Sequence, residues 1–110
     1  MAHVGLKIQS SNTDSFIDNE VGDISIRQKA DNKNIIFQSD DGSGGTATYL
    51  FLDGQNTRTE FLKDVKFPDN VKANFGNSGD LQIYHDGNNS FIRDITGTGD
   101  LKVDSNRLWI

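Results

Sequence analysis

The sequence predicts an all-β fold built from short strands and tight turns. Asp, Asn, Gly and Ser supply 45 of its 110 residues, and these residue types favour turns and caps. Helix-favouring residues are scarce, with 4 Ala and with 2 Glu against 14 Asp. Leu, Ile, Val and Phe still number 29 of the 110 residues. This share of the chain is above the roughly 20% below which charged chains stay unfolded. We therefore expect one folded, turn-rich segment spanning residues 1–110.

Short apolar runs, each closed by Gly, Asn, Asp or Ser, predict the strands in order along the chain. They are expected at residues 4–10, 15–19, 23–29, 34–38, 46–52, 58–67, 71–75, 81–85, 90–95, 101–104 and 107–110. We expect an interruption near Asp64 and a corner at residues 67–70, where turn formers follow Pro68. No window of eleven residues keeps the apolar spacing of a helix.

Three Asp-Gly pairs stand between predicted strands, at residues 41–42, 53–54 and 86–87. Asp-Gly favours type I′ hairpin turns, because both central residues of such a turn need a positive φ. We interpret these pairs as turns rather than as sites. The Gly-rich stretch at residues 40–46 is expected to form a flexible loop or a wide hairpin.

An offset of 75 residues aligns the two ends of the sequence. The shared pattern is L-x-I, a polar gap, S-F-I, a second gap and G-D-[I/L]-x-[I/V], with a two-residue insertion near residues 98–99. This pattern predicts an internal repeat of residues 5–26 at residues 80–103. Repeats of short strands that cannot each bury an apolar side are typical of elongated, quasi-one-dimensional β folds.

In L-x-I and I-x-I patterns the apolar residues share one side of the strand, because side chains alternate along it. Such strands could close as a small sandwich, as a single-chain solenoid, or around a core shared by several chains. We favour the shared core, since the strands lack the even spacing of a barrel and residues 108–110 would otherwise form an exposed pairing edge. We expect both that another chain covers this end and that the sequence is a piece of a longer fibre. The expected core residues are Leu6, Ile8, Phe16, Ile17, Ile24, Ile26, Leu50, Leu52, Phe61, Leu81, Ile83, Phe91, Ile92 and Leu101.

Charge and composition exclude several classes of function. A net charge of −5 disfavours general affinity for nucleic acid or for anionic membranes. No apolar run approaches the roughly 18 residues of a spanning helix, and residues 1–5 lack the parts of a secretion signal. The absence of Cys excludes disulfides, thiol nucleophiles and thiolate zinc sites. The expected partners are proteins, glycans or further copies of the chain, and no cofactor is expected.

Tyr84, His85 and Asp86 form the triplet that most resembles a chemical site, since a His beside a carboxylate can act as a base or a ligand. The position of His85 between a strand and a turn favours a surface or inter-chain contact instead. His3 is the only other His, so we predict no metal site; an ion ringed by three copies of His85 is the alternative. If copies of His85 meet, thermal stability should drop between pH 8 and pH 5.5.

The sequence predicts no catalytic residue. Asp pairs such as Asp40 with Asp41 could suggest glycoside hydrolysis, but 14 Asp in so many turns produce such pairs by chance. The Gly-rich stretch lacks the ending of a phosphate-binding loop. Ser39, Ser43 and Ser90 lie in no nucleophile motif.

The C-terminal two-thirds of the chain resembles a recurrent module of bacteriophage tail-fibre and related tail structural proteins, notably those of marine phages. The string G-D-L-Q-I-Y-H-D-G at residues 79–87 carries the resemblance, preceded by F-L-K-D-V-K-F at 61–67 and N-V-K-A-N-F-G at 70–76. The resemblance implies a fibrous, intertwined β-helix or β-prism homotrimer in a virion tail, made in the host cytoplasm. It supplies no catalytic motif.

We therefore expect a non-enzymatic shaft segment of a tail fibre that supports host attachment, with copies of itself and other virion tail proteins as partners. The alternative is a glycan-binding module that recognises the host receptor, with Tyr84, His85 and Trp109 as candidate contacts. A fragment of a polysaccharide-degrading tail spike is the third reading.

Overall fold

The computed structural model describes residues 5–110, and of Leu6 it describes the backbone alone. The predicted start of the first strand at Val4 lies outside these residues, as does His3. The described chain forms eight β-strands and no helix, which confirms the prediction of an all-β fold. None of its segments is therefore a helix that could cross a membrane.

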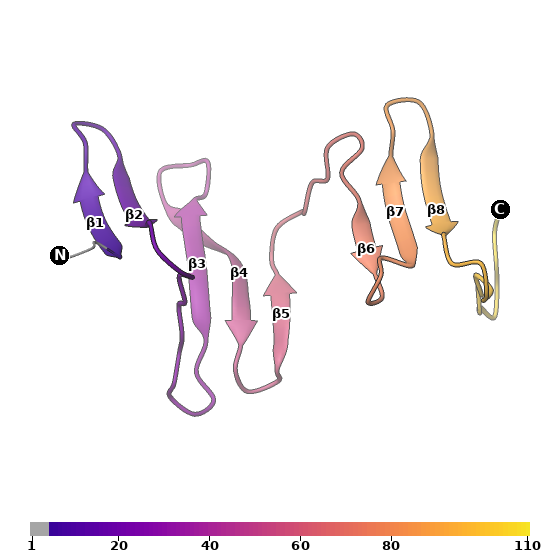
Figure 1. The fold of residues 1–110 in the computed structure, drawn as a ribbon, viewed down its shortest axis with the longest axis horizontal. Helices are drawn as coiled ribbons and strands as arrows, with labels where there is room; N and C mark the ends of the chain where they lie inside the picture. Colours follow the sequence, from indigo (N-terminus) through magenta and orange to yellow (C-terminus); the bar gives the residue numbers. More distant parts are fainter. Residues whose placement is uncertain (1–4) are drawn as a thin grey trace. The chain divides into compact units, whose positions relative to one another are not determined.

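The unit Met1–Lys63 contains two antiparallel sheets (Figure 1). One consists of β1 (Leu6–Ser10) and β2 (Ser15–Asn19), and the other has the order β3 (Ile35–Asp40), β4 (Thr46–Asp53), β5 (Arg58–Phe61). Within each sheet, consecutive strands pair with one another and are joined by a hairpin loop. No described strand of one sheet packs on a strand of the other. Neither the small sandwich nor the single-chain solenoid is formed by these two sheets.

The unit Asp64–Ile110 contains the third sheet, in which β6 (Ala73–Phe75), β7 (Leu81–His85) and β8 (Ser90–Asp94) follow one another (Figure 1). The unit begins with an extended segment and a turn, in which the N–H of Val71 donates to the carbonyl of Pro68 at 3.0 Å. Asn70 occupies the left-handed region there, with a φ of 67°.

Most predicted strands are found close to their expected places. The predictions at residues 15–19 and 81–85 coincide with β2 and β7. Those at residues 34–38, 46–52, 71–75 and 90–95 differ from β3, β4, β6 and β8 by one or two residues at one end or, for β3, at both ends. Alternating apolar patterns are therefore reliable here wherever a neighbouring stretch of the chain can pair with them.

Three predicted strands, at residues 23–29, 101–104 and 107–110, are not strands, and the one expected at 58–67 ends at Phe61. These segments carry a strand-like pattern, but their backbone forms no ladder with another strand. Only isolated bonds occur, such as that from the N–H of Leu62 to the carbonyl of Tyr49 and those between the Ser105 hydroxyl and the backbone of Arg107. A strand exists only where a second strand pairs with it, so the residue pattern alone could not decide these cases.

The hairpins β1–β2 and β7–β8 have the same length and register. An offset of 75 residues carries the bounds of β1 and β2 onto those of β7 and β8. The cross-strand pair Ile8↔Ile17 falls on the pair Ile83↔Ile92. The predicted repeat of residues 5–26 and 80–103 thus includes two hairpins of one geometry.

The turns of these two hairpins are also built alike. The N–H of Ser11 donates to the carbonyl of Asp14 at 2.7 Å, and the N–H of Asp86 donates to that of Asn89 at 3.0 Å. In each turn the first side chain accepts from the N–H groups two and three residues on. Ser11 Oγ does so at 3.2 and 2.8 Å, and Asp86 Oδ1 at 2.9 and 2.7 Å.

The Asp-Gly pairs lie at hairpin loops, but the prediction of type I′ turns is wrong. The loops leave four or five residues between the last paired positions, as between Asp40 and Thr46, and a type I′ turn leaves two. Gly42 and Gly87 have positive φ values of 84° and 100°, whereas no Asp has one. The Asp residues act instead as side-chain acceptors for the loop N–H groups.

No side chain that the structure describes is buried. The chain of 12.2 kDa exposes 9913 Å², whereas a compact monomer of this mass would expose about 6,100 Å² and two separate compact halves roughly 7,300 Å². The expected core residues that the structure describes are therefore not buried within their own units. A sheet of two or three strands with nothing on either face cannot bury its side chains.

Candidate interaction surface

The β3–β4–β5 sheet has one strongly apolar face. The cross-strand register places Ile35 beside Leu52, Phe37 beside Leu50 and Leu50 beside Phe61. Directly paired residues point to the same side, so these five side chains form one patch, the first apolar face. Phe61 is 54% exposed, and Phe37 and Leu52 are exposed as well. Such a patch is unusual for a chain that stays single in water.

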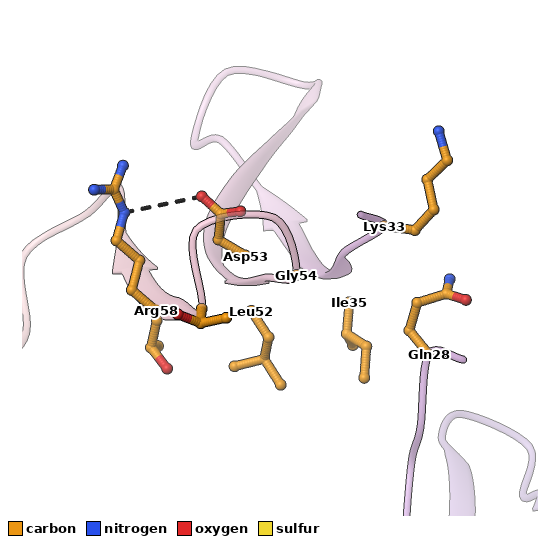
Figure 2. A pocket seen from close by; sticks show the side chains of 9 residues that line it. Gln28, Lys33, Ile35, Leu52, Asp53, Gly54 and Arg58 are labelled. Carbon is orange, nitrogen blue, oxygen red and sulfur yellow. Dashed lines mark ion pairs between the residues drawn. The ribbon is translucent and has the colours of Figure 1, made fainter. Parts of the chain in front are cut away.

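A hollow of about 490 Å³ lies at one end of this face (Figure 2). Figure 2 shows Ile35 and Leu52 pointing the same way, with Gln28 on a separate segment beyond Ile35. Asp53 points away from them toward Arg58, and Asp53 Oδ2 lies 3.9 Å from Arg58 Nε. The hollow thus has an apolar floor and a charged rim, and its lining lacks the paired acid and base of a catalytic site.

A β-bulge at Tyr49 keeps the first apolar face in register. The pairing shifts between Phe37 and Gln38, which leaves Tyr49 without a direct partner. Gln38 and Thr48 consequently share the opposite, more polar face, where Gln38 Nε2 donates to Thr48 Oγ1 at 3.2 Å. The Tyr49 hydroxyl donates to the carbonyl of Asp40 at 2.6 Å, which fixes its ring near the end of the sheet.

The β6–β7–β8 sheet has the second apolar face. Ile83 lies between Ala73 and Ile92, and Phe75 lies beside Leu81. Ile92 is 66% exposed. A hollow of about 660 Å³ covers part of this face, and Phe67 from the preceding extended segment is among its lining residues.

His85 lies at the edge of the second apolar face, because it alternates with Ile83 and Leu81 along β7. Its Nδ1 lies 2.9 Å from Oγ of Ser90, its cross-strand partner. Among residues 5–110 no three His, Asp or Glu side chains gather in a way that could hold a metal ion. His85 is thus held by a neutral hydroxyl rather than by a carboxylate.

Tyr84 points to the opposite face of the sheet from His85. Its ring stacks on that of Phe91 with centroids 4.8 Å apart and an interplanar angle of 18°. On the other side of β7, Nζ of Lys72 lies 5.0 Å from the centre of the Tyr84 ring. Tyr84 therefore sits in a row between a cation and an aromatic ring, and these contacts occupy the ring surface that a sugar would need.

The structure does not bring the three candidate receptor contacts together. Tyr84 and His85 are on opposite faces, and Trp109, which is 87% exposed, lines none of the hollows described here. The prediction that both residues of each Phe-Ile pair belong to one core is also wrong. Phe16 and Ile17, like Phe91 and Ile92, are adjacent in a strand and must point to opposite faces.

Some residues of the apolar faces were missing from the expected core. Ile35, Phe37, Ala73 and Phe75 were not included, although their alternation is visible in the sequence as I-x-F and A-x-F. Counting alternate positions in every predicted strand would have found them. The polar row of Lys72 and Tyr84 gives no such signal, because it depends on the register of β6 with β7.

Four carboxylates have pKa values lowered by hydrogen bonds within turns. The pKa of Asp41 is lowered most by the hydrogen bond from the N–H of Ser43 and next by the one from the N–H of Gly45. The pKa of Asp86 is lowered most by the N–H of Asn89 and next by the N–H of Asn88.

In the other two carboxylates, a hydrogen bond from a side chain is the main cause of the lowered pKa. The side-chain amide of Asn56 is the chief cause of the lowered pKa of Asp53. The side-chain hydroxyl of Thr96 is the chief cause of the lowered pKa of Asp94. A general acid needs a raised pKa, so these four carboxylates act as turn acceptors.

Comparison with family models, with curated proteins and with solved structures finds no match for this chain.

Proposed function

We propose that this chain is a structural shaft segment of a phage tail fibre, in which three copies bury one another's apolar faces. It supports host attachment as a spacer and carries out no chemistry of its own. The observation that carries the proposal is that every described side chain is at least partly exposed, although two sheets have a continuous apolar face. The assignment to a tail fibre comes from the resemblance of residues 61–67, 70–76 and 79–87.

The exposed area supports assembly rather than a free monomer. The chain exposes at least roughly 2,600 Å² more than two compact halves would. A standard interface buries about 800 Å² per partner, so this excess covers the two neighbours that each chain has in a trimer. Burying about 1,000 Å² of apolar surface per chain contributes roughly 25 kcal/mol before the cost of ordering is counted.

The polar groups support a mechanical role. The Asp residues with lowered pKa values are acceptors within turns, and the Tyr84 ring stacks on Phe91 and has Nζ of Lys72 5.0 Å from its centre. These groups hold the chain in shape. They leave the apolar faces as the surfaces available to a partner.

The mass of the chain in solution tests the proposal. Size-exclusion chromatography with light scattering should give three times 12.2 kDa, about 36.6 kDa, and this mass should persist on dilution. A mass of 12.2 kDa at every concentration would overturn the proposed assembly. A stable trimer fits the slow dissociation that a fibre under shear requires.

A further inference from the structure

Each of the three sheets is followed by a short segment with one residue pattern. The pattern is an Asp, an apolar residue, a polar residue and a second apolar residue. It occurs after β2 at residues 23–26 (D-I-S-I), after β5 at 64–67 (D-V-K-F) and after β8 at 100–103 (D-L-K-V). Within the described chain, the backbone of these segments makes no hydrogen bond to another backbone group. We call them the amphipathic segments.

The second and third amphipathic segments have the side-chain arrangement of a half-covered strand. In an extended chain the first and third residues point to one side and the second and fourth to the other. Val65 and Phe67 are 49% and 50% exposed, and Leu101 and Val103 are 48% and 63% exposed. Both segments therefore offer an uncovered apolar side and an unused row of backbone donors and acceptors.

Both segments border the second apolar face. Phe67 lines the hollow of about 660 Å³ with Ala73 and Ile83. Leu101 lines a hollow of about 450 Å³ with Leu81. A strand from another chain that paired with either segment would thus lie along the border of the second apolar face and extend it.

The two segments are complementary in charge when they run antiparallel. With Val65 opposite Leu101, Asp64 stands opposite Lys102, and Lys66 stands opposite Asp100. The two polar positions then pair opposite charges, and Val65 meets Leu101 on the other side, where Phe67 faces Gly99 and Val103 faces Lys63. Opposite charges stabilise directly facing positions of a β-ladder, and like charges destabilise them.

We propose that residues 64–67 of one copy pair antiparallel with residues 100–103 of a second copy of the same chain. The partner is a second copy because the chain carries both complementary segments and leaves both unpaired in itself. Pairing of two different segments is head-to-tail, and such contacts close into a ring when the rotation between copies closes and run on as a filament when it does not. The proposed homotrimer requires the ring. The inference rests on the proposed homotrimer and names the strands that join it.

Disulfide cross-linking tests the pairing directly, since the chain has no Cys of its own. Val65→Cys and Leu101→Cys are made as two separate single variants, mixed, denatured, refolded together and oxidised. Directly opposed strand residues lie within the Cα separation that a disulfide spans. The mixture should give a covalent dimer on non-reducing gels. The matched control replaces Val65→Cys by Lys66→Cys, whose side chain points to the other side, and should give markedly less dimer.

The outcomes separate the two proposals. A trimeric mass with a cross-linked mixture supports both. A trimeric mass without cross-linking, or with equal cross-linking in the control, overturns the strand pairing and leaves the proposed assembly standing. A monomeric mass overturns both.

Charge reversal gives a second readout that needs no oxidation. Lys66→Asp faces Asp100 with a like charge and should raise the dissociation constant of the trimer by roughly 2- to 5-fold per interface. Adding Asp100→Lys should restore the affinity. Equal weakening by the single and the double variant would overturn the pairing.

Discussion

At the scale of single residues, the chain is organised by side-chain oxygens that accept backbone N–H groups in turns. Asp86 closes the β7–β8 turn by accepting from Asn88 and Asn89. Ser11 closes the β1–β2 turn in the same way. Such acceptors replace water for loop N–H groups and hold the hairpin ends together. The many Asp residues of this sequence therefore serve its turns.

Asp86→Ala should lower the melting temperature, because two loop N–H groups lose their acceptor. Asp86→Ser should retain more of the stability, since Ser11 performs this role in the β1–β2 turn. Thermal unfolding followed by circular dichroism measures both variants. Equal melting temperatures for the alanine and serine variants would contradict the role given to Asp86.

Acid should weaken the fold through these same carboxylates. The pKa values of Asp41, Asp53, Asp86 and Asp94 are lowered in the folded chain, so each group stabilises it above its unfolded pKa near 3.8. That contribution is lost as the pH falls through the lower, folded pKa. These four groups should therefore leave the melting temperature unchanged between pH 7 and about pH 5. At pH values below about 4 the melting temperature should decrease. In Asp86→Ser the fall should be smaller.

At the scale of elements, the amphipathic sheet is the unit that matters. Each three-stranded sheet places large apolar side chains on one face by direct cross-strand pairing, as Ile83 with Ile92 and Phe37 with Leu50. The bulge at Tyr49 preserves this sorting over the length of β4. A sheet with an apolar face is stabilised when that face is buried against another element.

Ile83→Asp should abolish the trimer, because it places a charge in the centre of the second apolar face. Gln82→Asp is the matched control, since Gln82 precedes it in β7 and points to the other face, opposite Arg93. Light scattering should report a loss of the trimeric mass for Ile83→Asp alone. If Ile83→Asp remains a trimer, the second apolar face is not the surface that the copies bury.

At the scale of the whole molecule, the proposed trimer should couple folding to association. The described part of one chain contains no buried side chain, so in the proposed trimer the neighbouring copies would supply the core. An obligate assembly has no stability that is independent of chain concentration. Folding and assembly would then be one event.

The melting temperature should consequently rise with chain concentration. Calorimetry over a hundredfold range of concentration measures the effect under conditions where unfolding is reversible. A melting temperature that does not move with concentration would show that the chain stabilises itself. Such a result would contradict the shared core even if a trimeric mass were seen.

The sequence by itself determined the fold class, the hairpins and the side of each strand that is apolar. Turn residues and alternation are local properties, and β2 and β7 were placed to the residue from them. They also predicted strands at residues 23–29 and 101–104, where the described chain forms none. The same alternation was not applied to Phe16 and Ile17, which were both assigned to the core although neighbours in a strand face opposite ways.

Only the tertiary structure decided which strand-like segments find partners and whether a core is closed within the chain. Backbone pairing and burial join residues that are distant in sequence, so no local pattern reports them. The structure leaves residues 64–67 and 100–103 unpaired and the two apolar faces uncovered, for the same reason. A sheet buries an apolar face only when another layer packs on it, and neither unit supplies such a layer to its own sheets in the described residues.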